Sequence, residues 1–330
     1  MLLFLGGRIK GSSYCRVGVE ERVGVRGHLL CVPCTVRTAY DVAVRSTRDE
    51  ELREKVVMEV VRWLSSLRRV EQITPAELHT EVCRIARRIT GNTDPFRPVK
   101  QLSNRVAMRV LPTVRRRIEA SESFEEAFRI AVMGAICGNT IDFEVEGYKP
   151  SMRCLERSLL RCLGETLSID DIEVLTRLLS KSRRVLYLLD NAGEIAFDRL
   201  LIELIVERYP LKLWAVVKEG PILNDATVED ALQVDLTSIV EVVTTGNDHI
   251  GLKMEGTSER FRALLKEADL IIAKGQGYYE SIPEVEPAIS TPICYILRAK
   301  CSLVAESLGV HLQGNVVKVD LGGQRGVALK

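Results

Sequence analysis

Apolar positions follow a helical period through most of the first half of the chain. Between residues 49 and 180 they recur every three or four positions, which is the spacing of one face of a helix. The segment Thr74-Pro75-Ala76-Glu77 combines a capping threonine, a proline at the first helical position and a glutamate three residues after the cap. It predicts a helix to Thr90, ended by Gly91. We therefore expect a helical domain over residues 28–175.

The pattern changes near residue 175, where strand-like runs begin to alternate with helices. The expected strands are Val185–Leu189, Lys212–Val217, Ile239–Val243, Leu270–Ala273, Ile293–Leu297 and Val316–Val319, and the expected helices are 195–208, 227–233, 258–268 and 301–308. Such alternation predicts a largely parallel sheet with helices on both faces, so residues 176–330 form an α/β domain. Residues 1–27 have no helical period and are treated as a poorly defined N-terminal segment outside the core.

Polar side chains gather directly after four of these strands. They are Asp190-Asn191-Ala192-Gly193-Glu194, Asn224-Asp225, Lys274-Gly275-Gln276-Gly277 and Lys300. One such turn by itself is explained by helix capping. The carboxyl ends of parallel strands meet at one edge of the sheet, however, so four turns in register with four strands predict a ligand site.

The residue types at this edge suit a metal ion and a phosphate. The oxygens of Asp190, Asn191 and Asp225 are ligands that Mg²⁺ or Mn²⁺ prefers, while Co²⁺ and Ni²⁺ remain possible. Lys274 and Lys300 can neutralise phosphate oxygens. Gly275 and Gly277 flank Gln276 and predict a flexible loop here. In such a loop, backbone N–H groups can approach a phosphate.

Two further segments leave alternatives open. Gly138-Asn139-Thr140-Ile141-Asp142 follows an apolar helix and is either a ligand contact through Asn139 and Asp142 or a helix end with a turn. Cys31-Val32-Pro33-Cys34 opens another helix. Its two cysteines are packed thiols at a helix start, half of a metal site completed by a distant cysteine, or a redox pair.

Composition excludes several classes of protein. A net charge of +1 and 5% aromatic residues argue against nucleic acid as a partner. Apolar runs fall well short of a membrane span, and no signal peptide is recognised, so a cytoplasmic location without membrane association is expected. The nine cysteines are scattered, and most lie in apolar periodic stretches, which favours buried thiols in a reducing compartment. Nothing in the sequence indicates the oligomeric state.

The polar turns, taken in this order, resemble the DUF89 family of damage-control phosphatases, in particular its stand-alone archaeal-type members. The resemblance covers roughly residues 28–320 and rests on Asp190 to Glu194 with Asp198, Asn224 to Thr227, Ala268 to Gly277, Ala299-Lys300-Cys301, Gly138 to Phe143 and the Cys31/Cys34 pair. It implies a helical N-terminal part on a three-layer α/β/α sandwich with a Rossmann-like sheet. It also implies divalent-metal-dependent hydrolysis of phosphate monoesters such as sugar phosphates or damaged phosphometabolites.

The resemblance maps roles onto individual residues. The metal would be held by Asp190, Asn191 and Asp225, and the phosphate by Lys274, its glycine loop and Lys300. We expect a metal-activated water to attack phosphorus, with Glu194 positioning the water, and Asp190 as the alternative nucleophile. The partner is then a small phosphorylated metabolite. The alternatives are a metal-dependent nucleotide- or metabolite-binding protein without hydrolase activity, and a redox or metal protein built on the cysteine pair.

Overall fold

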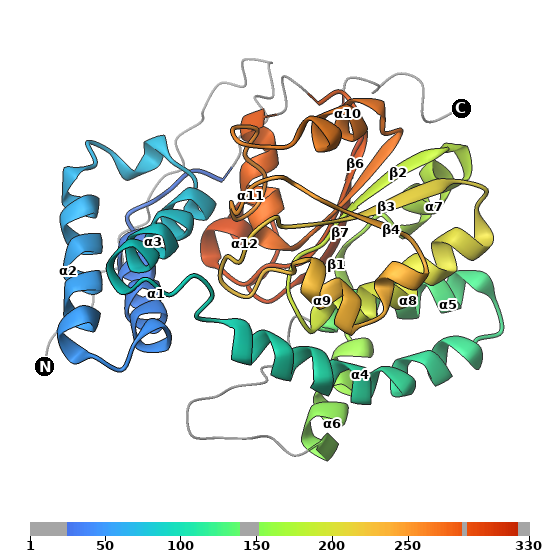
Figure 1. Ribbon diagram of the computed structural model, residues 1–330. Helices are drawn as coiled ribbons and strands as arrows, with labels where there is room; N and C mark the ends of the chain where they lie inside the picture. The colour runs from blue at the N-terminus through green and yellow to red at the C-terminus, as the bar shows by residue number, and fades with distance from the viewer. Residues whose placement is uncertain (1–24, 139–151, 286–288, 323–330) are drawn as a thin grey trace, which may run out of the picture.

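The architecture is that of a computed structural model, which describes residues 25–138, 152–285 and 289–322 (Figure 1). The helices are α1 (Cys31–Ser46), α2 (Glu50–Ser66), α3 (Pro75–Thr90), α4 (Arg97–Glu119), α5 (Phe124–Cys137), α6 (Met152–Leu163), α7 (Ile172–Lys181), α8 (Glu194–Arg208), α9 (Val228–Gln233), α10 (Glu259–Glu267), α11 (Gly275–Val285) and α12 (Ser302–Leu308). The strands are β1 (Leu167–Asp170), β2 (Arg184–Leu188), β3 (Lys212–Val217), β4 (Glu241–Thr244), β5 (Leu270–Lys274), β6 (Ile293–Arg298) and β7 (Asn315–Asp320).

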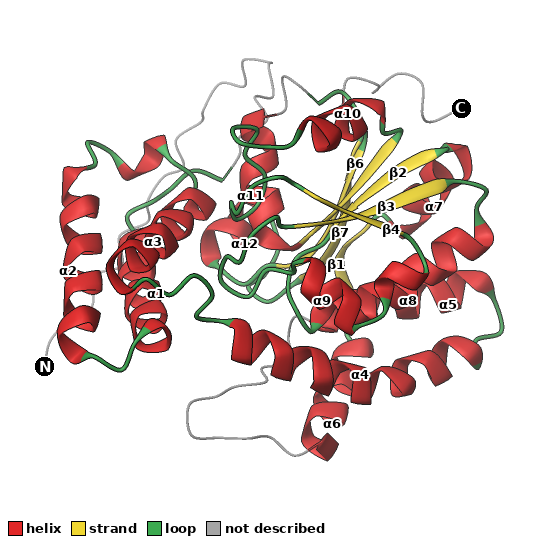
Figure 2. Ribbon diagram, in the orientation of Figure 1, coloured by secondary structure: helices red, strands yellow, loops and turns green. Residues whose placement is uncertain are grey.

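A seven-stranded sheet forms the centre of the molecule (Figure 2). Its order is β1-β7-β6-β5-β2-β3-β4, and every neighbouring pair is parallel except β6 and β7. The central strands are continuous apolar runs that are buried on both faces, as parallel sheets require. Strands β2, β3, β5 and β6 run in the same direction, so the polar turns that follow them open at one edge.

Helices cover both faces of the sheet and produce three layers. Helices α4, α5 and α8 share one apolar core with one face, and α10, α11 and α12 share a second core with the other. Helices α1, α2 and α3 form a smaller cluster of their own beside this sandwich (Figure 1). The predicted α/β/α sandwich with a largely parallel sheet is confirmed. The helices before residue 175 contribute to two separate cores, and the domain boundary near that residue stays a prediction.

All six expected strands are present, with ends that agree to within two residues. One strand was not expected: β1 lies in a region whose periodicity predicts helix throughout, so that prediction is wrong for Leu167–Asp170. The strand has only four residues at the sheet edge, and none of them is fully buried. A strand this short and half-exposed shows no alternation of apolar and polar residues, so the sequence pattern does not predict it.

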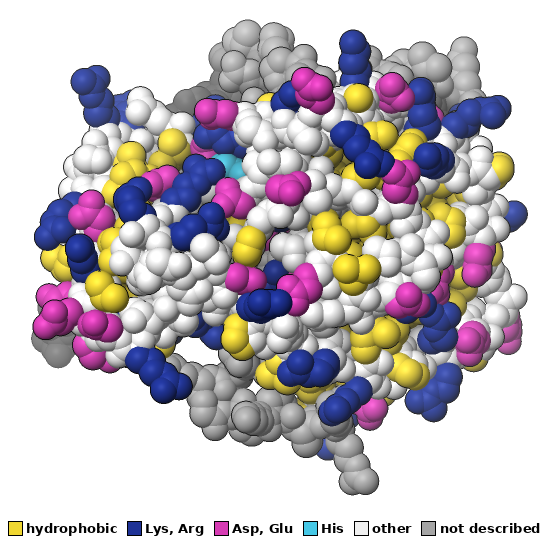
Figure 3. Space-filling view, in the orientation of Figure 1, with side chains coloured by type: hydrophobic (Ala, Val, Ile, Leu, Met, Phe, Trp, Pro, Cys, Tyr) yellow, Lys and Arg dark blue, Asp and Glu magenta, His cyan; other side chains and the backbone are white. Residues whose placement is uncertain are grey.

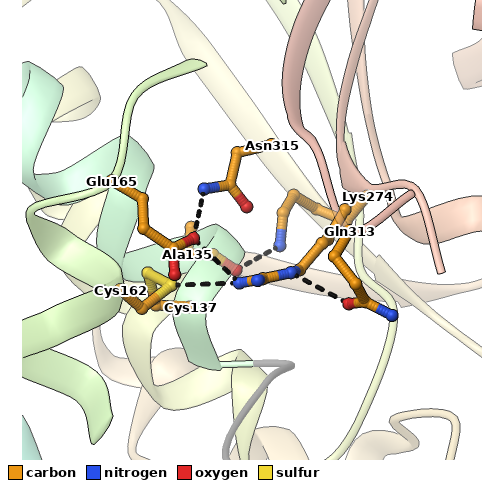
Figure 4. Close-up of a disulfide and its surroundings, with 8 residues drawn as sticks. Ala135, Cys137, Cys162, Glu165, Lys274, Gln313 and Asn315 are labelled. Carbon is orange, nitrogen blue, oxygen red and sulfur yellow. Dashed lines mark hydrogen bonds and ion pairs between the residues drawn. A yellow bond between two sulfur atoms is a disulfide. The ribbon is translucent and has the colours of Figure 1, made fainter. Parts of the chain in front are cut away.

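The expectation that the cysteines are thiols is wrong for one pair. Cys137 at the end of α5 and Cys162 near the end of α6 form a disulfide with a Cα–Cα distance of 5.8 Å (Figure 4). The Arg298 guanidinium lies against it, 3.5 Å from the Cys162 sulfur, and pairs with Glu165 at 3.1 Å. The two cysteines are separated by 25 positions, and only the packing of α5 against α6 brings them together.

None of the helices in the described ranges combines the length and the apolar character that a membrane span requires. Acidic and basic side chains are interspersed over the face in Figure 3, in keeping with a net charge of +1.

His249, in the connection between β4 and α10, makes the stability of the fold sensitive to acid. It is 2% exposed, and its Nδ1 lies 2.6 Å from the Ile250 carbonyl oxygen. Burial lowers its pKa from 6.5 to about 4; the Ile250 carbonyl and Glu77 act in the opposite direction, and Lys253 and Lys218 add to the lowering. As pH falls from about 6.5 to about 4, the unfolded chain therefore takes up a proton that the native protein does not, and stability is lost.

We expect this one group to reduce the free energy of unfolding by about 2 kcal/mol between pH 7 and pH 5. His249→Asn should flatten that part of the stability profile in urea unfolding experiments at the two pH values. The exposed His311→Asn serves as the control. An unchanged pH dependence in His249→Asn would show that the histidine has the same pKa in the native and the unfolded protein.

Candidate active site

The turns after β2 and β3 are hydrogen-bonded to each other, and this brings the side chains of Asp190, Asn191 and Asp225 together. Asn191 and Asp225 form an isolated antiparallel bridge, and the Ala226 N–H donates to the Asp190 carbonyl oxygen at 2.8 Å. Asp225 is 5% exposed, while Asp190 and Asn191 are half-buried. Backbone pairing therefore places two carboxylates and one amide side by side at the predicted edge.

A glycine and a buried asparagine hold the start of α8 in place. Gly193 has a φ of 80°, in the left-handed region that favours glycine, and its N–H donates to the Asn104 side-chain oxygen at 2.6 Å. The Asn104 amide donates in turn to Asp230 at 2.9 Å and Gln233 at 2.8 Å. Asn104 lies on α4 within a helical stretch, and nothing in its spacing marks it, so sequence reasoning missed this positioning residue.

Lys274 lies at the centre of a buried ionic network behind the turn. Its ammonium donates to the Ala135 carbonyl oxygen at 3.0 Å, forms an ion pair with Glu194, and contacts Asp198 at 2.9 Å. The Tyr187 hydroxyl donates to the same Asp198 oxygen at 2.6 Å. All three ammonium donors thus have protein partners, and a direct phosphate contact by Lys274 requires the exchange of one of these bonds.

The electrostatics of this network keep the lysine charged. Burial alone lowers the pKa of Lys274, but the carboxylates of Asp198 and Glu194 outweigh it and hold that pKa above its usual value. Burial raises the pKa of Asp198 to about 6, against the opposing effect of Lys274. Glu194 is 2% exposed, and its other oxygen accepts from the Asn191 amide at 3.3 Å. The network therefore connects the core of the sheet to the turn that carries Asp190 and Asn191.

The segment Gly275-Gln276-Gly277 forms the first turn of α11, so the expectation of a flexible glycine loop is wrong. Gly275 has a φ of +81°, and a Cβ there would lie 1.9 Å from an Asp190 carboxylate oxygen. The carboxylate therefore rests directly on the glycine, at the positive end of the helix. Gly277 instead packs closely against Ile250 and Gly251.

Gln276 and Lys300 connect α11 to the turn after β6. The Gln276 side-chain oxygen accepts from the Lys300 N–H and from the Cys301 N–H, the latter at 3.3 Å. The Lys300 ammonium lies within electrostatic range of Asp190 and Glu194. Lys300 is an exposed residue, and partial desolvation lowers its pKa, while these two carboxylates oppose the change. Lys300 thus supplies positive charge facing the acidic turn.

Lys218, immediately after β3, is a second buried cation that sequence reasoning did not assign to the site. Its ammonium lies 3.8 Å from an Asp225 oxygen, 2.5 Å from the Gly251 carbonyl oxygen and 3.1 Å from the Tyr278 hydroxyl. Burial lowers its pKa, and Asp225 and Asp190 act against that effect. The signal was available, because Lys218 begins a polar stretch at the same strand edge as the residues that were chosen.

Asn139 and Asp142 lie outside the described residues. The described chain before them ends at Gly138, where a Cβ would lie 2.6 Å from the Phe197 ring and 3.2 Å from the Glu194 Cα. The end of α5 is thereby packed against the first turn of α8, next to the Lys274 network.

The chemistry of the acidic turn fits a hard divalent cation. Burial raises the pKa of Asp190 well above its usual value, and Glu194 and Asp225 raise it further. Burial likewise raises the pKa of Asp225 to about 6, against Lys218 and Lys100. The Asn191 amide nitrogen donates to Asp190 at 2.8 Å, which leaves the amide oxygen for another ligand. A cation would relieve this crowding of negative charge.

Among the residues that the structure describes, protein side chains alone do not form a complete cage for an ion. In the described ranges, no three His, Cys, Asp or Glu side chains are arranged to hold a metal. The Asn191 amide, water and substrate oxygens would complete the coordination, as is usual for Mg²⁺.

The fold and the site define an α/β protein of the Rossmann-like class, with carboxylates, an amide and lysines at the carboxyl edge of its sheet. Residues 28–316 match the sequence model of the damage-control phosphatase ARMT1-like domain, and the chain belongs to this family, also called DUF89.

Archaeal relatives match over nearly their whole length. A damage-control phosphatase of Archaeoglobus fulgidus is 38% identical over 88% of this chain and 98% of its own. One of Pyrococcus horikoshii is 33% identical over 85% of this chain and 93% of its own. The crystal structure of a DUF89 family protein from Pyrococcus horikoshii superimposes with a TM-score of 0.79 at 32% identity, covering 88% of this chain and 98% of that one.

Proposed function

We propose that this protein is a divalent-metal-dependent phosphatase that hydrolyses phosphate monoesters of small metabolites. The observation that carries the proposal is the backbone bridge between Asn191 and Asp225, which gathers Asp190, Asn191 and Asp225 into one half-buried group of oxygen donors. Membership of the damage-control phosphatase family supports phosphate ester hydrolysis as the reaction. Sugar phosphates and damaged phosphometabolites are the substrates we propose.

Asp190, Asn191 and Asp225 would hold the metal. When bound there, a divalent cation supplies Lewis-acid polarisation of a phosphate oxygen and lowers the pKa of a coordinated water. Lys300 lies within electrostatic range of Asp190 and Glu194 and would supply positive charge that stabilises the phosphate oxygens as negative charge develops. The attacking water releases a proton to solvent as its oxygen bonds to phosphorus, the ester P–O bond breaks, and the leaving oxygen takes a proton from solvent.

Glu194 and Lys274 act in this proposal by positioning other groups. Both Glu194 oxygens have protein partners, Lys274 and Asn191. Glu194 therefore holds the Asn191 amide nitrogen inward, so that the amide oxygen is available as a ligand. Lys274 fixes Glu194 and neutralises it. We propose that the substrate phosphate lies near Gln276 and the start of α11 at Gly275. Backbone N–H groups at this end of the helix would then interact with it.

Turnover tests this proposal directly. The purified chain should release phosphate from p-nitrophenyl phosphate and from members of a sugar-phosphate and nucleotide panel with Mg²⁺, Mn²⁺, Co²⁺ or Ni²⁺, and a chelator should stop the reaction. Tight nucleotide binding by calorimetry without phosphate release under any metal would favour a binding protein instead. A phosphoryl adduct mapped to Asp190 after acid quench would replace the water mechanism by attack of that carboxylate.

A further inference from the structure

Lys218 is a buried cation that the proposed reaction does not use. It directly follows β3 and is 1% exposed. Its ammonium donates to the Gly251 carbonyl oxygen at 2.5 Å and to the Tyr278 hydroxyl at 3.1 Å, and it lies 4.4 Å from the centre of the Tyr278 ring. These partners are neutral, whereas a buried ammonium also needs a negative charge nearby. Asp225 provides that charge, with a carboxylate oxygen 3.8 Å away.

The Asp225 carboxylate depends in turn on this lysine. It is 5% exposed, and within the described part of the chain it accepts no hydrogen bond and forms its one ion pair with Lys218. At 3.8 Å this contact is an electrostatic one and is too long for a hydrogen bond. Buried carboxylates are normally satisfied by donors at shorter range. The Asp225 oxygens therefore have capacity for a further cation, and Lys218 is their counter-charge in the metal-free protein.

Helix α11 holds the lysine ammonium in place. Gly251 has a φ of +68°, and a Cβ there would lie 2.2 Å from the Gly277 carbonyl oxygen, so the connection between β4 and α10 rests directly on α11. Tyr278 belongs to the same helix, and the Asp190 carboxylate rests on its first residue, Gly275. One helix therefore fixes the position of the ammonium relative to both carboxylates of the proposed metal site.

We propose that Lys218 is the resident counter-ion of this metal site, which balances Asp225 in the metal-free protein and lowers the affinity of the site for a divalent cation. The inference rests on the proposed role of Asp190, Asn191 and Asp225 in holding the metal. Lys218 is held by two neutral partners, so it stays near Asp225 when a second cation shares that carboxylate. Repulsion between a fixed ammonium and a divalent ion is strong in a buried site, and it outweighs the orientation that the lysine gives to the carboxylate.

Manganese binding measures this effect without substrate. Free Mn²⁺ is followed by electron paramagnetic resonance while it is titrated into the full chain after treatment with a chelator. Lys218→Met, which keeps most of the side-chain volume, is expected to bind Mn²⁺ about 10-fold more tightly than the parent. A purely structural lysine predicts the opposite sign, because a loosened Asp225 would bind the ion more weakly.

Urea unfolding provides a second readout. In EDTA, Lys218→Met should unfold at a lower urea concentration than the parent, because a buried carboxylate has lost its counter-charge. Adding Asp225→Asn should recover part of that loss. Saturating Mn²⁺ should stabilise Lys218→Met by about 1.4 kcal/mol more than it stabilises the parent, which is the 10-fold difference in affinity expressed as a free energy.

Two further variants keep the test specific. Lys253→Met removes a lysine from the same connection as Gly251, where it pairs with Glu77 at 2.9 Å, and should leave the Mn²⁺ affinity at the parent value. Lys218→Gln keeps a donor for the Gly251 carbonyl oxygen and should show the same tighter binding, so the test does not depend on the folding of the methionine variant.

The outcomes separate this inference from the proposed function. If the parent binds Mn²⁺ and Asp225→Asn does not, the metal site stands, and parent-like or weaker binding by the Lys218 variants overturns the counter-ion role alone. A parent chain that binds no Mn²⁺, or that binds it equally well as Asp225→Asn, would refute the metal site itself and this inference with it.

Discussion

Asp225→Asn is expected to lower metal-dependent kcat/KM for phosphate ester hydrolysis by about 10³-fold, or roughly 4 kcal/mol. The change keeps the size of the side chain and the bridge to Asn191, which is made by backbone groups. It removes one of the two carboxylates that would hold the metal and leaves Asp190 and the Asn191 amide as a weaker donor set. Rates over a range of Mn²⁺ and Mg²⁺ concentrations are the measurement.

The fold should survive this change. Asp225 and Asp190 repel each other, so loss of one charge relieves part of the crowding. Lys218 loses its ion pair with Asp225 but keeps its bonds to the Gly251 carbonyl oxygen and the Tyr278 hydroxyl and the attraction of Asp190. Urea unfolding is therefore expected to differ little from the parent. Asp41→Asn, on the exposed side of α1, is the matched control and should have the parent rate. If Asp225→Asn keeps more than a tenth of the activity, the metal is held elsewhere.

Lys274→Met is expected to destabilise the protein by about 3–5 kcal/mol. The ammonium is fully buried and is the cation that pairs with the buried carboxylates of Glu194 and Asp198. Methionine fills much of the same volume but removes the positive charge that contacts both acids. The Ala135 carbonyl oxygen also loses its donor. Urea unfolding at pH 7 measures the loss.

Two comparisons make this prediction specific. Lys253→Met removes a lysine that is 36% exposed and pairs with Glu77 at 2.9 Å, and it should cost less than about 1 kcal/mol. Adding Asp198→Asn to Lys274→Met should recover part of the lost stability, because it removes one of the two stranded charges. A loss for Lys274→Met no larger than that for Lys253→Met would mean that the buried acids are protonated without penalty.

The sequence pattern predicted the sheet well because each central strand is a local signal. A continuous apolar run that ends in a polar turn is typical of a buried parallel strand, and all six such runs are strands. The same rule placed Asp190, Asn191, Asp225 and Lys300 at one edge, where the structure brings them together. It failed for β1, which is too short and too exposed to produce a pattern.

The role of the glycines near Gly275 was less predictable. Two glycines around Gln276 have the composition of a flexible loop, and local propensity disfavours a helix there. In the structure α11 begins at Gly275, and this position requires glycine because the Asp190 carboxylate occupies the space that any Cβ would need. This contact joins the Asp190 side chain, in the turn after β2, to the backbone at the start of α11, so no local sequence pattern predicts it.

By itself, the sequence determined the alternation of strands and helices and the edge at which the polar turns meet. Only the tertiary structure decided which side chains are partners there. Lys274 reaches Glu194 across 80 positions and Ala135 across 139, and the Cys137–Cys162 disulfide depends on how α5 and α6 pack. Periodicity and capping are properties of neighbouring residues, whereas these contacts form when separate helices and strands bury their apolar faces against one another.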